Sequence, residues 1–267
     1  MLKRNINKLC LFFTVMTVLS ACSPSQPNET SKNTQLTVSV AASMADALDE
    51  VVTKFEEEHP DIDVLLNVGS SGGLQQQIAQ GAPVDLFLSA ASDKMDVLRE
   101  QGLLDERYTT PLVTNQIVLI RSSDVKQLVE GFRQLNQPAI EKIAIGTPES
   151  VPAGMYAKQT LESRNVFEAV EEKIVFGKDV TQVLTYVETG NVQVGMVYAT
   201  DAVKSDKVEV VGIANEIDHD NIQYPLAILK DTKHPQHAVK FYQFLTSEQA
   251  VEVFQTYGFT PIEVAES

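Results

Sequence analysis

The segments VAASM (residues 40–44) and VGSSGGL (residues 68–74) each join an apolar run to a helical pattern through a turn of small, neutral residues. VPAGMY (residues 151–156) and GKDVT (residues 177–181) are similar junctions later in the chain. At each junction a predicted strand runs into a predicted helix, whose first N–H groups lack an intrahelical acceptor and carry partial positive charge. Because helix N-termini of this kind bind anions, the junctions predict a site for a small oxyanion that needs no cationic side chain.

Strands and helices alternate on both sides of these junctions. Hydrophobic patterning predicts strands at residues 36–40, 64–68, 84–88, 117–120, 143–145, 194–197 and 226–229. It predicts helices at residues 44–59, 74–81, 153–164, 180–189, 235–245 and 248–257. This alternation indicates an α/β fold with mainly parallel sheets, which bind ligands at the carboxyl ends of their strands, where the junctions fall.

The N-terminus is typical of an export signal. Residues 1–21 combine the basic side chains of Lys3, Arg4 and Lys8 with a mostly apolar stretch, and the sequence Leu-Ser-Ala-Cys ends at Cys22. This ending resembles a lipobox, in which the cysteine carries diacylglycerol, so we predict a lipoprotein signal peptide and lipidation of Cys22. The alternative is a secreted protein cleaved after Ala21 with a free thiol at Cys22. Polar residues 22–35 are predicted to form a flexible tether.

Composition restricts the possible partners. The chain has 267 residues, of which 21 are basic and 36 acidic, and the first 21 residues contain three of the basic side chains and none of the acidic ones. The remainder therefore carries a formal charge of −18, which argues against nucleic acid and against a polybasic membrane patch. Affinity for an anion must then be local. Of the two cysteines, Cys10 lies within the signal, which leaves no disulfide for the folded part.

A family resemblance rests on five segments in combination. They are AASMADAL (41–48), GSSGGLQQQIAQGAPVDLFLSA (69–90), PESVPAGMYAKQTL (148–161), DVTQVLTYVETGNVQVGMVYATDA (179–202) and FLTSEQAVEVFQTYGF (244–259). The sequence resembles the molybdate-binding proteins of bacterial ABC importers from about Leu36 to about Thr260. The resemblance implies a two-lobed periplasmic-binding-protein type II fold. Lobe 1 would comprise residues 36–115 plus 224–267 and lobe 2 residues 116–223, with the ligand in the cleft between them.

The resemblance also implies a set of ligand contacts. Ser43 and Ser71 would each give a hydroxyl and a backbone N–H, Ala153 and Val180 would give backbone N–H groups, and Tyr198 its phenol. Ser70 is a weaker candidate. No catalytic residue, cofactor or direct metal ligand is expected, and the pair His234 and His237 is interpreted as a solvated turn.

Other interpretations of these residues remain open. Ser43 is also a suitable N-cap, and Ser70 and Ser71 suit a turn before the glycine pair. The Tyr198 hydroxyl would alternatively meet a backbone carbonyl. Asp179 is predicted to cap the helix at Val180, and it is the nearby acceptor for a proton from hydrogen phosphate.

The expected function is that of a monomeric, membrane-tethered receptor on the extracytoplasmic face. It would capture molybdate, and tungstate, by hinge closure and deliver the anion to an ABC permease and its ATPase. Sulfate, phosphate and ferric-ion receptors are alternatives, although a ferric receptor usually has paired tyrosines and no adjacent pair occurs here. An enzyme acting on a phosphorylated or sulfated metabolite would need a base or nucleophile, for which only Asp179 or a serine is available.

Overall fold

The computed structural model describes residues 33–124 and 129–262 of the chain. The predicted signal peptide, the lipidation site at Cys22 and most of the predicted tether lie outside the described residues. Within the described ranges, no helix has both the length and the apolar character that crossing a membrane requires.

The first of two sheets has six strands in the order β11-β4-β10-β3-β1-β2. Their bounds are β1 Thr34–Ala41, β2 Ile62–Gly69, β3 Leu86–Leu88, β4 Leu104–Thr114, β10 Gln223–Leu229 and β11 Thr260–Pro261. Strand β1 pairs in parallel with β2 and β3, whereas β10 is antiparallel to β3 and β4. The carboxyl ends of β1 and β2 therefore lie at the same edge of the sheet, next to each other.

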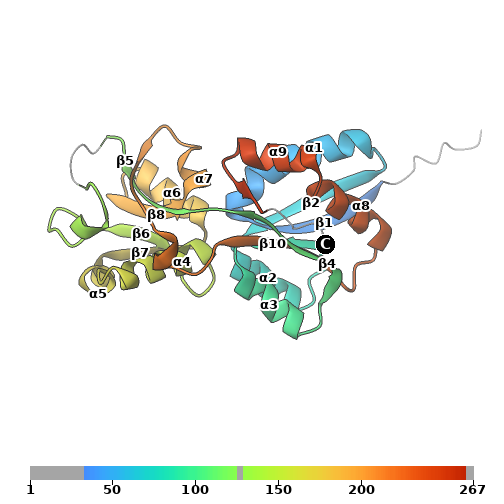
Figure 1. The fold of residues 1–267 in the computed structure, drawn as a ribbon, viewed down its shortest axis with the longest axis horizontal. Helices are drawn as coiled ribbons and strands as arrows, with labels where there is room; N and C mark the ends of the chain where they lie inside the picture. Colours follow the sequence, from blue (N-terminus) through green and yellow to red (C-terminus); the bar gives the residue numbers. More distant parts are fainter. Residues whose placement is uncertain (1–32, 125–128, 263–267) are drawn as a thin grey trace, which may run out of the picture. The chain divides into compact units, whose positions relative to one another are not determined.

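Helices cover both faces of this sheet (Figure 1). On one face lie α1 (Ala45–Glu58), α8 (Pro235–Leu245) and α9 (Glu248–Thr256), and on the other α2 (Ser71–Ala79) and α3 (Ser92–Glu100). Buried aromatic side chains join α1 to α8, because the ring of Phe55 lies 4.8 Å from that of Phe241 and 5.4 Å from that of Phe244. The C-terminal helices thus complete a core that the N-terminal strands begin.

The second sheet has five strands in the order β7-β6-β8-β5-β9. The strands are β5 Ile117–Ser122, β6 Ile143–Gly146, β7 Ile174–Gly177, β8 Val194–Tyr198 and β9 Val208–Ile213. The helices of this lobe are α4 Pro152–Ser163, α5 Phe167–Val170, α6 Val180–Glu188 and α7 Ala199–Ala202. Strand β6 is parallel to β7 and β8, and β5 is antiparallel to β8 and β9.

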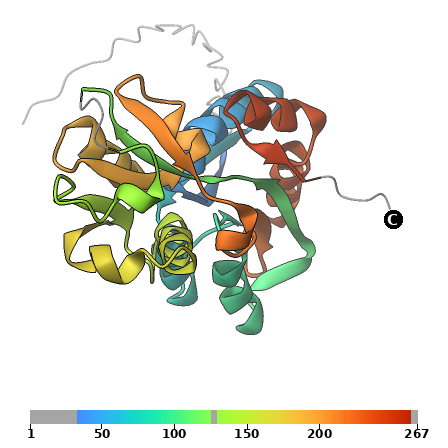
Figure 2. The ribbon, with the colours of Figure 1, turned by 60° about the vertical axis from the view of Figure 1, so that its left-hand side comes forward.

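Each sheet is mixed, which differs from the expectation of mainly parallel sheets. The difference arises where the chain passes between the sheets, after Thr114 and again before Gln223. These two residues are register partners in the antiparallel pair β4 and β10, so the outgoing and returning segments lie side by side (Figures 1 and 2). The strand by which the chain enters each sheet after the crossing, β5 in the second sheet and β10 in the first, runs antiparallel to the strands of the βαβ units. The fold is two-lobed α/β, and the residue boundaries of the lobes remain our proposal.

Most predicted elements are confirmed with small changes at their ends, and α8 has the predicted bounds. One change bears on the site. The helix predicted to begin at residue 44 begins at Ala45, because Ala42–Met44 forms a turn of 3₁₀ helix instead.

Candidate functional site

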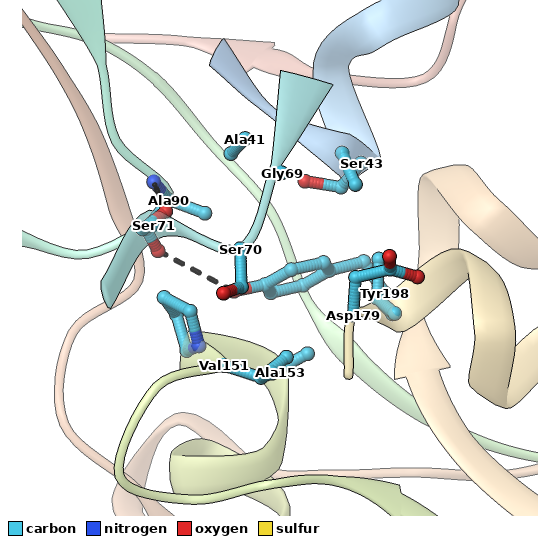
Figure 3. A pocket seen from close by; sticks show the side chains of 13 residues that line it. Ala41, Ser43, Gly69, Ser70, Ser71, Ala90, Val151, Ala153, Asp179 and Tyr198 are labelled. Atoms are coloured by element: carbon cyan, nitrogen blue, oxygen red, sulfur yellow. Dashed lines mark hydrogen bonds between the residues drawn. The ribbon is translucent and has the colours of Figure 1, made fainter. Parts of the chain in front are cut away.

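The four junctions of small residues converge on one pocket between the lobes (Figure 3). Its volume is about 10 Å³, which is room for about one water-sized sphere. All six residues predicted to contact the ligand line it: Ser43, Ser70, Ser71, Ala153, Val180 and Tyr198. The remaining lining residues are Ala41, Ala42, Gly69, Ala90, Val151, Pro152 and Asp179.

Figure 3 shows how the two lobes contribute. Ser43, Ser70 and Ser71 lie on one side of the pocket and Val151 and Ala153 on the other, with Tyr198 between them. No lysine, arginine or histidine is among the residues that line the pocket, and Asp179 is the one carboxylate. Attraction for an anion must therefore come from N–H and O–H groups.

Ser43 lies in the 3₁₀ turn and does not cap a helix. The N-cap positions of this turn and of α1 are Ala41 and Met44, and neither makes a side-chain cap bond. The interpretation of Ser43 as an N-cap is therefore wrong. The Ser43 hydroxyl is buried and lies 3.0 Å from the hydroxyl of Tyr224, a residue of β10 that sequence reasoning did not include in the site.

Ser70 and Ser71 have different roles at the start of α2. Ser70 is the N-cap, and its Oγ accepts the Gly73 N–H at 3.3 Å. Ser71 is fully buried, and its Oγ accepts the Ala90 N–H at 2.9 Å. The turn interpretation thus describes Ser70 well, whereas Ser71 holds the end of β3 in place. Accepting a bond leaves the hydrogen of the Ser71 hydroxyl available, since a serine hydroxyl has one donor and two lone pairs.

The second lobe contributes the N-termini of α4 and α6. Helix α4 begins at Pro152 without a side-chain cap, so the N–H of buried Ala153 is one of the N-terminal groups that lack an intrahelical acceptor. A Cβ at Gly154 would overlap the carbonyl oxygen of Gly146, so glycine permits this close approach of helix and strand. The N–H of Val180 is similarly placed as the first residue of α6.

Asp179 caps α6, as predicted. Its carboxylate accepts the Gln182 N–H at 2.8 Å. The one carboxylate at the pocket is therefore already bonded to a helix N-terminus, where a negative charge is stabilised.

Tyr198 ends β8 and is buried beneath the pocket. Its hydroxyl donates to the carbonyl oxygen of Ala90 at 3.3 Å, which is the alternative contact considered from the sequence. Burial raises the pKa of Tyr198 well above its ordinary value, so the phenol keeps its hydrogen at physiological pH. The contact to Ala90 is long for an O–H···O bond, and an anion in the pocket would compete for the same hydrogen.

Direct bonds join the lobes around the pocket. The Gly72 N–H donates to the Ser150 carbonyl at 2.9 Å. On another side, Lys204 reaches across to Asp46 at 2.8 Å and to the carbonyl oxygen of Ser43 at 3.2 Å. Lys204 was not predicted from the sequence, because nothing in its local pattern indicates a contact with Ser43, which lies 161 positions away.

A buried carboxyl lies close to this contact. Burial raises the pKa of Asp201 to about 7, and its Oδ2 has no hydrogen-bond partner within the described part of the chain. The Lys204 ammonium, 3.8 Å from the other carboxyl oxygen, opposes this shift. No group of three or more His, Cys, Asp or Glu side chains that could hold a metal occurs among residues 33–124 and 129–262.

Comparison with known proteins assigns the chain to a family. A family model described as a bacterial extracellular solute-binding protein matches residues 36–260. The chain is 47% identical over 257 residues to YvgL of Bacillus subtilis (strain 168), which is named as an ABC transporter substrate-binding lipoprotein, and the match covers 95% of this chain and 98% of YvgL. It is 34% identical over 231 residues to the molybdate-binding protein ModA of Escherichia coli (strain K12), with 85% and 89% covered.

A solved structure supports the same relationship. It is described as the substrate-binding domain of a molybdenum ABC transporter from Clostridium difficile, is 40% identical and superposes with a TM-score of 0.68. The match covers 86% of this chain and all of that one. These relatives are solute-binding transport proteins, and the relatives of this chain include proteins named as molybdate-binding. The chain belongs to the bacterial extracellular solute-binding protein family.

Proposed function

We propose that this protein binds molybdate, and tungstate, in the pocket between its lobes and delivers the anion to an ABC permease and its ATPase. The observation that carries the proposal is that six predicted contact residues from both lobes line one small pocket whose donors are all neutral. Relatives named as molybdate-binding proteins support this choice of ligand.

The chemistry of the pocket favours a fully ionised anion. A hydrogen bond to a charged acceptor contributes about 1.5–3 kcal/mol, and several of them converging on one dianion exceed the cost of ordering and closure. Closure of the lobes over a bound anion would exclude water, and each donor would then act in a medium of low dielectric constant. Neutral donors can thus bind an anion although the whole chain is strongly acidic.

The same donors discriminate among anions. Phosphate at neutral pH is partly protonated, and its O–H would face other donors, which leaves a buried hydrogen bond unmade at a cost of about 1–3 kcal/mol. Asp179 is the one carboxylate among the residues that line the pocket, and it already accepts the Gln182 N–H. Sulfate brings no proton, but it is smaller than molybdate, so donors at fixed positions would be too far away to contact all four oxygens at once.

The proposed cellular setting follows from the N-terminus. A lipid on Cys22 and the tether that follows would hold the receptor at the outer face of the cell membrane, as a monomer. YvgL, which is 47% identical to this chain and is named a lipoprotein, supports an anchored form. An enzymatic role is disfavoured, because the pocket offers no free base: Asp179 caps a helix and Ser71 Oγ accepts a backbone N–H.

Calorimetric titration of the purified protein with oxyanions tests the proposal. We expect molybdate and tungstate to bind far more tightly than sulfate, with phosphate the weakest, and Asp179→Asn to leave that order intact. Phosphate binding as tight as molybdate binding, lost in Asp179→Asn, would show that Asp179 accepts a ligand proton and that the molybdate assignment is wrong.

A further inference from the structure

Three side chains, of which Tyr224 and Ser43 are buried and Asn115 is partly buried, form a chain of hydrogen bonds that ends at the pocket. Asn115, in the segment between β4 and β5, donates from Nδ2 to the hydroxyl of Tyr224 at 3.2 Å. The Tyr224 hydroxyl lies 3.0 Å from Oγ of Ser43, which lines the pocket. Asn115 also donates to Oγ1 of Thr200 at 2.8 Å, which connects the chain of bonds to the second lobe.

The direction of the first bond follows from the placement of the Asn115 amide. Its Oδ1 accepts the N–H of Gln116 at 2.9 Å, so the amide nitrogen faces Tyr224 and Thr200. An amide nitrogen donates and cannot accept. The oxygen of Tyr224 is therefore the acceptor in its bond with Asn115.

The direction of the second bond follows from the burial of Tyr224. Only 1% of this residue is exposed, so its hydroxyl hydrogen needs an acceptor inside the protein. Within 3.5 Å the Tyr224 hydroxyl has hydrogen bonds to Asn115 and Ser43, and because Asn115 presents hydrogens, Oγ of Ser43 is the acceptor at that distance. The Tyr198 hydroxyl also interacts with Tyr224, but it donates its own hydrogen to the carbonyl oxygen of Ala90. Tyr224 keeps this hydrogen, because burial raises its pKa well above the ordinary value.

Ser43 consequently accepts from Tyr224 and retains its own hydrogen. Building on the proposed function, we propose that Asn115 and Tyr224 are positioning residues that hold the Ser43 hydroxyl as a donor to the bound oxyanion. Bonds aligned in one direction polarise each other, which strengthens the final donor. This relay from Asn115 through Tyr224 to Ser43 begins in the segment that joins β4 to β5 and passes through β10. The Ser43 hydroxyl is therefore held correctly only when both of these connections between the lobes are in place.

A double-mutant cycle on molybdate affinity tests the relay. We expect Tyr224→Phe to weaken binding roughly five- to tenfold, the size of one lost hydrogen bond. In the Ser43→Ala background the same change should alter the dissociation constant by less than about twofold, because the group that Tyr224 positions is gone. Tyr242→Phe, which removes a hydroxyl from α8 away from the pocket, should leave affinity unchanged.

Each outcome decides the inference. Equal losses from Tyr224→Phe in both backgrounds, or no loss in either, would overturn it, since a packing role does not depend on Ser43. If Tyr224→Phe fails to fold in thermal denaturation, Asn115→Ala replaces it, with an expected loss of about two- to fivefold that again disappears without Ser43.

The proposed function can fail separately. If wild-type protein binds sulfate or phosphate instead of molybdate, the molybdate assignment is wrong, and the same cycle run with that anion still decides the relay. If the wild type binds none of the three anions, both proposals fail.

Discussion

We expect replacement of Gly72 by alanine to weaken ligand binding without destabilising the ligand-free protein. Gly72 is the second residue of α2 in the first lobe, and its N–H donates to the Ser150 carbonyl in the second lobe at 2.9 Å. Ser150 precedes the N-cap of α4, so this bond lies beside two of the helix N-termini that form the pocket.

The size of the effect follows from the space around Gly72. A Cβ there would lie 2.7 Å from Cα and 2.8 Å from the carbonyl oxygen of Ser150, whereas ordinary contact begins at 3.4 Å. Both are backbone atoms, so the lobes must separate locally by about 0.7 Å. Donors displaced by that amount lose good geometry to an anion held by the other lobe. Loss of the Gly72 bond and weakening of one ligand bond amount to about 2 kcal/mol, or roughly thirtyfold in affinity.

Without ligand, the Gly72→Ala substitution should leave the thermal stability of the protein unchanged or raise it. Alanine within a helix is favoured over glycine by roughly 0.5–1 kcal/mol, so thermal unfolding without ligand should occur at an equal or higher temperature. Gly73→Ala is the matched control, because it gains the same helix propensity while its Cβ meets only Oγ of Ser70, at 3.0 Å. Calorimetry should find its molybdate affinity within about threefold of wild type, a difference below 1 kcal/mol. Wild-type affinity in Gly72→Ala would refute the reasoning, since the contact with Ser150 would then be absent from the liganded state.

Further predictions concern pH, the ligand donors and the anchor. Because the pKa of Asp201 rises to about 7 in the folded protein, the folded state binds a proton more tightly than the unfolded state, and stability should fall as pH rises from about 4 to about 7. Asp201→Asn should remove this slope, at most about 1.4 kcal/mol per pH unit, in denaturation curves at pH 5 and pH 8; an unchanged slope would assign it to other groups. Ser43→Ala and Ser71→Ala should each weaken molybdate binding by about 1–3 kcal/mol, and Tyr198→Phe by a similar or smaller amount, measured by calorimetry with folding checked by thermal denaturation. Unchanged affinity in all three would remove them from the site. Cys22→Ser should release the protein from the membrane fraction with affinity unchanged, and an intact mass of the wild type without lipid would contradict the anchor.

The local elements could be predicted from the sequence because each follows from neighbouring residues. The helix at Pro235–Leu245 is confirmed from its proline start and its apolar spacing. The cap at Asp179 is likewise confirmed, because an aspartate before an apolar helical run has few other uses. Convergence of the four junctions on one pocket came from the family resemblance, since periodicity does not say which strands become neighbours.

The parts that were missed depend on contacts between distant residues. Ser43 has the local pattern of an N-cap, yet its hydroxyl meets Tyr224, 181 positions away in the chain. The mixed sheets have the same origin, because the antiparallel pairing of Thr114 with Gln223 is set by the return of the chain from the second lobe. Neither Tyr224 nor Gln223 carries a local sign of its partner.

A pocket without cations must discriminate through distance. A lysine or arginine would attract any anion, whereas N–H and O–H donors contribute only within about 3.2 Å of an acceptor. The size of the pocket is set by residues with minimal side chains on both lobes, among them Ala41, Gly69, Ala90 and Ala153. Because these four residues have small side chains, backbone donors can reach the ligand. None of the four has a flexible side chain that could move to fill the space left by a smaller anion. Because the donors must lie this close to the ligand, affinity depends on full closure of the two lobes. A single methyl group at Gly72, outside the pocket lining, is therefore expected to weaken binding.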